Sequence, residues 1–133
     1  MKGLRAKSPR PISIRSVLNC ADNSGAKELR VINVKGFGGR RKRHPKAGLG
    51  DVVICSVIKG KEKLRHTVVW AVIVRQKKGF RRPDGTRVKF ADNAAVLVNT
   101  KTLDPVGTEI RSVVAKEVTE KYLTIGKISN VVV

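Results

Sequence analysis

The chain has 133 residues, and its 29 lysines and arginines against 10 acidic residues give a formal charge of +19. So much like charge on one domain-sized chain favours a polyanionic partner, above all nucleic acid. The longest apolar run, residues 68–74, is far shorter than the ~18 residues of a membrane span, and no apolar segment follows the basic residues 1–16. We therefore expect a cytoplasmic protein with no membrane partner.

The N-terminal part combines a basic arm with two strands. Residues 1–13 form the expected arm, in which prolines at positions 9 and 11 exclude helix. Residues 16–20 predict a short strand, and the following Ala-Asp-Asn-Ser-Gly predicts a turn held by local side-chain hydrogen bonds. Residues 28–37 alternate apolar and polar positions, which predicts a half-buried strand.

Residues 36–51 predict a basic loop, because three glycines precede a run of arginines and lysines. Gly36-Phe37-Gly38-Gly39 resembles a phosphate-cradling loop. However, the Gly-Lys-Ser/Thr ending is missing, and basic residues and a proline follow where a helix would begin. We therefore expect a loop that contacts RNA and no nucleotide site.

Residues 51–59, 67–75 and 94–99 are rich in β-branched residues and bounded by glycine or charge, so each predicts a strand. With the two earlier strands they make five, joined by connections too short for parallel crossovers. The expected fold is mainly β: a five-stranded antiparallel small barrel with a projecting β-hairpin and a short helical C-terminal part.

The projecting hairpin lies within residues 71–97, where two apolar strands flank a cationic segment. Pro83-Asp84-Gly85 supplies a tight turn, since glycine tolerates positive φ. The cations of this segment are opposed locally only by Asp84 and Asp92. Binding phosphates would relieve their mutual repulsion.

The last stretch changes character. Pro105-Val106-Gly107-Thr108 predicts a turn, and residues 114–122 have helical spacing. We expect a single domain over residues 1–133, divided into the arm (1–13), a β-barrel with basic loops (14–110) and short C-terminal helices (111–133).

Residue types that perform catalysis or bind metals are scattered along the chain. Cys20 and Cys55 lack Cys-x-x-Cys spacing, so we expect buried reduced thiols and no zinc site with His44 or His66. The ten carboxylates form no close sequence cluster for metal-assisted cleavage. We expect no catalytic residue, no metal and no cofactor.

Recognition of RNA is expected to depend on its backbone. Aromatic residues make up only 4% of the chain, and Trp70 lies in an apolar strand, which disfavours base stacking on an aromatic platform. Contacts from arginine and lysine to phosphates and 2′-hydroxyls are favoured instead. The candidate RNA-binding residues are Arg5, Lys7, Arg10, Arg40, Arg41, Lys42, Arg43, Lys46, Lys77, Lys78, Arg81, Arg82 and Arg87.

Several ordered motifs resemble those of the universal large-subunit ribosomal protein fourteen family. Its signature is matched in spacing by Ala71-Val72-Ile73-Val74, Asp84-Gly85, Phe90, Asn93 and Val96. Further similar segments are Cys20-Ala21-Asp22-Asn23-Ser24-Gly25-Ala26, Gly48-Leu49-Gly50-Asp51 and Pro105-Val106-Gly107-Thr108-Glu109-Ile110. The resemblance spans about residues 14–125. Two features differ from the bacterial pattern: the basic arm is longer, and Glu109 stands where bacterial members often carry arginine. Both features resemble those of archaeal or eukaryotic members.

This resemblance implies a five-stranded barrel bound to large-subunit ribosomal RNA beside neighbouring large-subunit ribosomal proteins. It also implies an inter-subunit face that meets small-subunit ribosomal RNA at a bridge and that an anti-association initiation factor occupies. Thr108, Glu109 and Lys121 fall on this implied face.

Two other functions are open at the level of sequence. The first is a free RNA-binding barrel that acts as an RNA chaperone or translation factor, which would be expected to show surface aromatics and a less extreme charge. The second is an RNA-processing enzyme, against which the scattered carboxylates argue.

Overall fold

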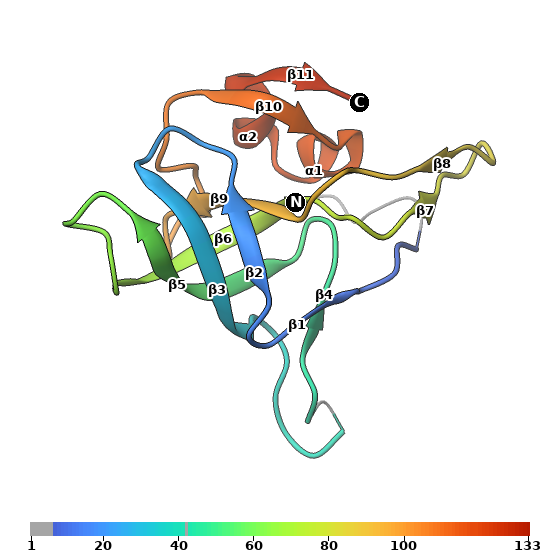
Figure 1. Cartoon of the computed structure of the whole chain (residues 1–133). Helices are drawn as coiled ribbons and strands as arrows, with labels where there is room; N and C mark the ends of the chain where they lie inside the picture. Colours follow the sequence, from blue (N-terminus) through green and yellow to red (C-terminus); the bar gives the residue numbers. More distant parts are fainter. Residues whose placement is uncertain (1–6, 42) are drawn as a thin grey trace.

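Five strands close into a barrel, which confirms the predicted fold. The computed structural model describes residues 7–41 and 43–133. Each barrel strand pairs antiparallel with the next one along the chain, and the first and last strands close the barrel in parallel (Figure 1). A meander with an odd number of strands must close in this way, because its first and last strands run in the same direction. The barrel strands are β2 (Val17–Cys20), β3 (Ala26–Val34), β5 (Val52–Gly60), β6 (Val68–Arg75) and β9 (Ala94–Val98).

Strands β6 and β9 lie between two apolar cores. Ala71 and Ile73 of β6 belong to the cluster that fills the barrel, whereas Val72 and Val74 belong to a second cluster on its outer side. Successive side chains of a strand point to opposite faces, so a strand between two cores is apolar at every position. This explains the unbroken apolar run at residues 69–74, whereas Val68 at its start is exposed.

The second core lies between the barrel and a C-terminal unit, which Figure 1 shows packed on one side of the barrel. The unit consists of β10 (Ile110–Val114), α1 (Lys116–Lys121), α2 (Leu123–Ile128) and β11 (Ser129–Val132). β10 and β11 pair in parallel, and the two helices form the crossover that a parallel pair requires. Val118 and Ile125 are the buried residues of the short helices, so packing stabilises them.

The C-terminal segment differs from the expectation for residues 111–133. Helices occupy only residues 116–128, and strands flank them on both sides. The strands are short, and their pairing joins residues separated by two helices, so no local alternation indicates them.

Among the described residues, no helix has the length and apolar character needed to cross a membrane.

Two short antiparallel ladders position the basic segments. β1 (Ile12–Ser13) pairs with β4 (Lys46–Ala47), and the buried Ile12 and Ala47 anchor this ladder in the barrel core. β7 (Phe80–Arg81) pairs with β8 (Arg87–Val88), and Phe80 anchors this ladder in the second core. Figure 1 shows the β3–β4 loop and the β7–β8 hairpin projecting from the barrel in different directions.

Candidate RNA-binding surface

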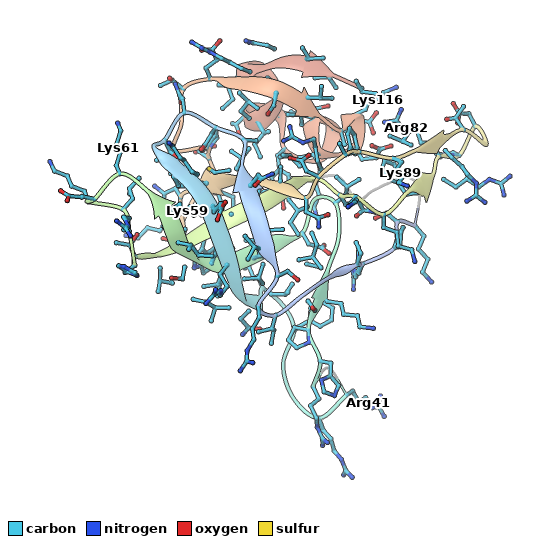
Figure 2. All side chains as sticks on the ribbon, in the orientation of Figure 1. Arg41, Lys59, Lys61, Arg82, Lys89 and Lys116 are labelled. Atoms are coloured by element: carbon cyan, nitrogen blue, oxygen red, sulfur yellow. The ribbon has the colours of Figure 1, made fainter. Side chains whose placement is uncertain are left out.

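The loop of residues 36–46 carries exposed cations. Gly36 and Gly39 adopt φ angles of 85° and 75°, which glycine reaches without strain, and the chain turns outward there. The three arginines that follow are exposed, and no carboxylate among the described residues forms an ion pair with them. Figure 2 shows Arg41 extending away from the barrel. A hollow of about 700 Å³, called the loop hollow below, is lined by Arg40, Arg41, Arg43, His44 and Lys46.

The β7–β8 hairpin presents a second group of cations. Arg81 and Arg87 lie directly opposite each other in the ladder, and both are exposed. Lys77 and Lys78, which precede the hairpin, are exposed as well. Like charges that face each other across a ladder repel, and a bound phosphate would offset this repulsion. The hairpin therefore fits the predicted contact with RNA.

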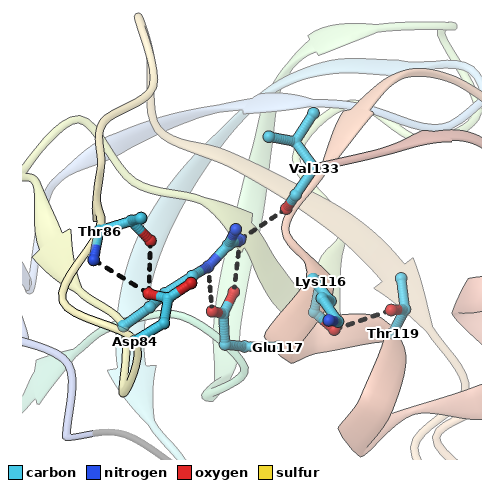
Figure 3. Close-up of polar contacts among 7 residues, drawn as sticks. Asp84, Thr86, Lys116, Glu117, Thr119 and Val133 are labelled. Atoms are coloured by element: carbon cyan, nitrogen blue, oxygen red, sulfur yellow. Dashed lines mark hydrogen bonds and ion pairs between the residues drawn. The ribbon is translucent and has the colours of Figure 1, made fainter.

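Arg82 fastens the hairpin to the C-terminal unit (Figure 3). Its Nε donates to Glu117 Oε1 at 2.7 Å, and its Nη2 donates to Glu117 Oε2 at 3.3 Å and to the Val133 carbonyl at 2.7 Å. At the turn, Asp84 accepts hydrogen bonds from the hydroxyl and backbone N–H of Thr86, which hold the pKa of the Asp84 carboxyl below its usual value. The Arg82 and Glu117 side chains are only 18% and 14% exposed. Arg82 thus has a structural role besides its predicted contact with RNA.

Arg75 is a buried cation that joins the barrel to β10. Its Nε and Nη2 donate to the two carboxylate oxygens of Asp92 at 2.9 and 3.1 Å, and its Nη1 donates to the Val113 carbonyl at 2.8 Å. Asn19 donates a further hydrogen bond to Asp92 at 3.0 Å. Burial opposes ionisation of Asp92, but the hydrogen bonds from Arg75 and Asn19 and the arginine charge outweigh it and lower the pKa of Asp92.

The basic arm and the first C-terminal helix meet at a second hollow. It has a volume of about 690 Å³ and is called the arm hollow below. Its cationic lining comes from the predicted residues Lys7, Arg10, Lys46 and Lys121. Two other predicted residues, Arg5 and Lys42, lie outside the described residues.

Asn23 holds the loop that contains Thr108 and Glu109. Its Oδ1 accepts hydrogen bonds from the backbone N–H groups of Thr108 at 2.9 Å and Glu109 at 3.4 Å, and its Nδ2 donates to the Thr108 hydroxyl at 2.9 Å. Gly107 is required beside them, because an added Cβ would lie 2.8 Å from Asn23 Oδ1. Thr108 is exposed at this loop, whereas Lys121 belongs to the arm hollow.

Two groups of exposed cations lie outside the predicted set. Figure 2 shows Lys89 and Lys116 near Arg82, and Lys59 and Lys61 at the end of β5. Lys89 follows β8 and Lys116 begins α1, so the cationic surface of the hairpin continues towards the C-terminal unit. The charges of Lys89 and Lys116 are visible in the sequence, but their position beside the hairpin depends on tertiary contacts.

The aromatic side chains are buried or half-buried. None of the five aromatic side chains falls in the exposed class. Trp70, expected in the core, is half-buried, and the ammonium of Lys35 lies 5.0 Å from its ring centroid. Stacking of bases on exposed rings is therefore disfavoured, which agrees with recognition through phosphates.

Both cysteines are free thiols, and we expect them to be unreactive in the folded chain. Burial raises the pKa of Cys55 to about 12, and burial together with the Asp22 carboxylate raises the pKa of Cys20 to about 12. The thiolate is the nucleophile, so alkylation by iodoacetamide at mildly alkaline pH should be slow until denaturant is added. Mass spectrometry over time measures the rate of alkylation, and rapid alkylation of Cys20 in the folded chain would contradict the prediction.

Among the described residues, no group of three or more His, Cys, Asp or Glu is placed to hold a metal ion.

These features define a class of protein. Arginines that are exposed and have no acidic partner among the described residues project on loops from a closed barrel, and the aromatic side chains are buried or half-buried. A basic β-barrel of this kind is suited to contact the backbone of structured RNA.

Comparison with known proteins identifies the family within this class. The sequence model of the family "Ribosomal protein L14p/L23e" matches residues 11–133. The chain is 47% identical to large ribosomal subunit protein uL14 of Halobacterium salinarum and 49% identical to that of Halorubrum lacusprofundi, in both cases over the full length of both chains. It is 50% identical to that of Methanothrix thermoacetophila, over 98% of this chain and 96% of that protein. The chain belongs to the ribosomal protein L14p/L23e family and is of the archaeal type, which confirms the resemblance noted in the sequence.

Proposed function

We propose that this protein is a structural constituent of the large ribosomal subunit that binds ribosomal RNA through the 36–46 loop and the β7–β8 hairpin. The observation that carries the proposal is the set of exposed loop arginines without acidic partners among the described residues, in a chain with a charge of +19. Family membership supports the same role, because the relatives are large-subunit ribosomal proteins. The protein is accordingly located in the cytoplasm, in the ribosome, where neighbouring large-subunit proteins are further partners.

The proposed role is structural and not catalytic. Three carboxylates that could serve an RNA-cleaving centre are engaged within the fold. Asp22 accepts hydrogen bonds from its own turn and from the Leu97 backbone, Asp92 accepts from Arg75, and Glu117 pairs with Arg82. Each of them stabilises a junction between segments.

We further propose that the loop with Thr108 and Glu109 contributes to the inter-subunit face. Small-subunit ribosomal RNA at a bridge and an anti-association initiation factor are the partners proposed for this face. Asn23 fixes the backbone of the loop, and Thr108 remains exposed, so the loop can present a defined surface. The proposal rests mainly on Thr108 and Glu109. Lys121, the third residue predicted for this face, donates to the Gly50 carbonyl and lines the arm hollow.

Sedimentation of cell extract tests the main proposal. We expect the protein in the fractions of large subunits and joined ribosomes, because its charge requires an RNA partner and its family consists of ribosomal proteins. Detection by quantitative mass spectrometry should give about one copy per large subunit. Recovery mainly at the top of the gradient would contradict the proposal and favour a free RNA-binding barrel that acts as an RNA chaperone or translation factor.

A further inference from the structure

The arm hollow gathers cations from three segments that are distant in the sequence. Lys7 and Arg10 come from the arm, Lys46 from β4, and Lys121 from the end of α1. Ser8, Pro9, Leu49 and Asp51 complete the lining. Four positive charges and one negative charge leave the hollow with a net charge of +3.

Backbone contacts hold the arm against one wall of this hollow. The β1–β4 ladder pairs Ser13 with Lys46, so the arm runs beside the end of the 36–46 loop. At Gly48 the packing is close, because an added Cβ would lie 2.5 Å from the Pro9 carbonyl oxygen. The Gly48 backbone N–H also donates to Asp51 Oδ2 at 2.8 Å.

Another part of the lining is held through the Gly50 carbonyl. Lys121 Nζ donates to this oxygen at 2.9 Å, and the hydroxyl of Tyr122 donates to it at 3.0 Å. The ammonium of Lys121 also lies 5.4 Å from the centroid of the Tyr122 ring, but neither the carbonyl nor the ring carries a negative charge that would neutralise it. The ammonium has three donors in all, so donors remain for a further acceptor.

The one carboxylate in the hollow does not neutralise it. Asp51 lies 3.5 Å from Arg10 Nε and also accepts the hydrogen bond from Gly48. The Arg10 side chain is 54% exposed, so this ion pair is solvated and weak. The remaining three cations face the hollow without an acidic partner among the described residues.

The arm hollow and the loop hollow meet at Lys46, which lines both. We propose that the two hollows form one continuous track that binds consecutive phosphates of a single RNA strand, with Lys121 as a phosphate contact. This inference rests on the proposed function. It goes beyond that proposal because it assigns Lys121 to RNA binding and joins the arm, the loop and α1 into one binding site.

The lining favours an RNA strand over an acidic peptide. Four of the five residues that line the loop hollow are lysine or arginine, as are four of the eight that line the arm hollow. Leu49 in the arm hollow is only 1% exposed and so offers little apolar surface. A peptide partner would be expected to add an apolar anchor in a pocket, whereas a run of phosphates needs only cations spaced along a path.

Removal of single charges along the track tests the proposal in the full-length protein. Lys46→Met and Lys121→Met keep the apolar stems, and Tyr122 still donates to Gly50, so circular dichroism should show folded variants. Lys101→Met is the matched control, because Lys101 is an exposed lysine outside both hollows and its loss changes the net charge equally. The probe is protein-free large-subunit ribosomal RNA, titrated over a series of salt concentrations.

We expect each track variant to lower the slope of log affinity against log salt by about 0.8, which corresponds to about fivefold weaker binding at ~0.15 M salt. The double variant should lose about twice that slope, and the control should match the wild type. Phosphate-ethylation interference should map the wild-type contacts to a run of neighbouring phosphates, part of which becomes insensitive in the double variant.

Other outcomes separate the two levels of the proposal. If the wild type binds with steep salt dependence but the track variants match Lys101→Met, the track is refuted while the proposed function stands. If Lys46 and Lys121 are protected from acylation only in the intact large subunit and not by RNA alone, a protein occupies the hollow and the inference is overturned. If the wild type itself fails to bind the RNA, both are refuted.

Discussion

Replacement of Arg75 by methionine should lower the free energy of unfolding by about 2 kcal/mol. The methionine keeps much of the apolar stem but removes the two bonds to Asp92 and the bond to the Val113 carbonyl. The Arg75 side chain is only 11% exposed, so water replaces these partners poorly. Asp92 is 34% exposed and can be rehydrated in part, which places the expected loss below that of a fully buried pair. Urea denaturation at neutral pH, followed by circular dichroism, measures the change.

The same ion pair should make stability depend on pH. Because the folded-state pKa of Asp92 lies below its ordinary value of 3.8, the folded state favours the carboxylate. The stability from this group is fully present above the unfolded-state pKa, and it is lost as the pH falls through the folded-state pKa. The wild type should therefore lose stability in acid more steeply than Arg75→Met does, and the difference between the two proteins should shrink at low pH.

Arg111→Met is the control for charge. The Arg111 side chain is 87% exposed and pairs with Glu109 at 3.3 Å, so its loss should change stability by less than about 0.5 kcal/mol. Arg75→Lys restores the charge without the planar fork and should give an intermediate value. Equal unfolding free energies for Arg75→Met and Arg111→Met would show that the junction with β10 does not depend on Arg75.

The barrel could be predicted from the sequence because its signals are local. Strands β5, β6 and β9 are short segments rich in β-branched residues, β3 alternates apolar and polar positions, and β2 precedes a clear turn. The five strands pair in chain order, so recognition of each strand is enough to obtain the topology. The tight turn at Asp84 was likewise visible, since the side-chain hydrogen bonds to Thr86 and the positive φ of Gly85 both arise within a few residues.

The features that sequence analysis missed depend on residues far apart in the chain. β10 and β11 form a parallel pair across two helices, and no local pattern specifies that pairing. The charge run of the hairpin does not distinguish the exposed Arg81 from Arg82, which contacts Glu117, or from the buried Arg75. For arginines, the acceptor within reach decides between a structural role and a surface role, and the fold supplies that acceptor.

The candidate site likewise combines features that have local sequence signals with features that depend on tertiary contacts. The arginines of the 36–46 loop could be identified from their density and the flanking glycines, and the structure finds them exposed. The resemblance to the family implies a place for Lys121 on the inter-subunit face. Its position in the arm hollow depends on the packing of α1 against the Gly48–Asp51 turn, which no spacing in the sequence encodes.

The combined change of Arg40, Arg41 and Arg43 to alanine should have the largest effect on RNA binding. If each arginine neutralises one phosphate, the slope of log affinity against log salt falls by about 2 to 2.7, and binding to large-subunit ribosomal RNA weakens roughly 100-fold at ~0.15 M salt. Stability should change little, since the three side chains are exposed and have no acidic partner among the described residues. Filter binding across a series of salt concentrations measures both the slope and the affinity.

The matched control for this variant is the combined change of Lys61, Lys63 and Arg65 to alanine. These residues are exposed on the loop between β5 and β6, and their removal lowers the net charge by the same amount. If net charge alone governed binding, the two triple variants would weaken it equally, because long-range attraction depends on total charge. Close contact with phosphates requires instead that cations be placed along the RNA path, so the loop variant should lose much more affinity and slope than its control. Equal losses in the two variants would remove the 36–46 loop from the RNA-binding surface.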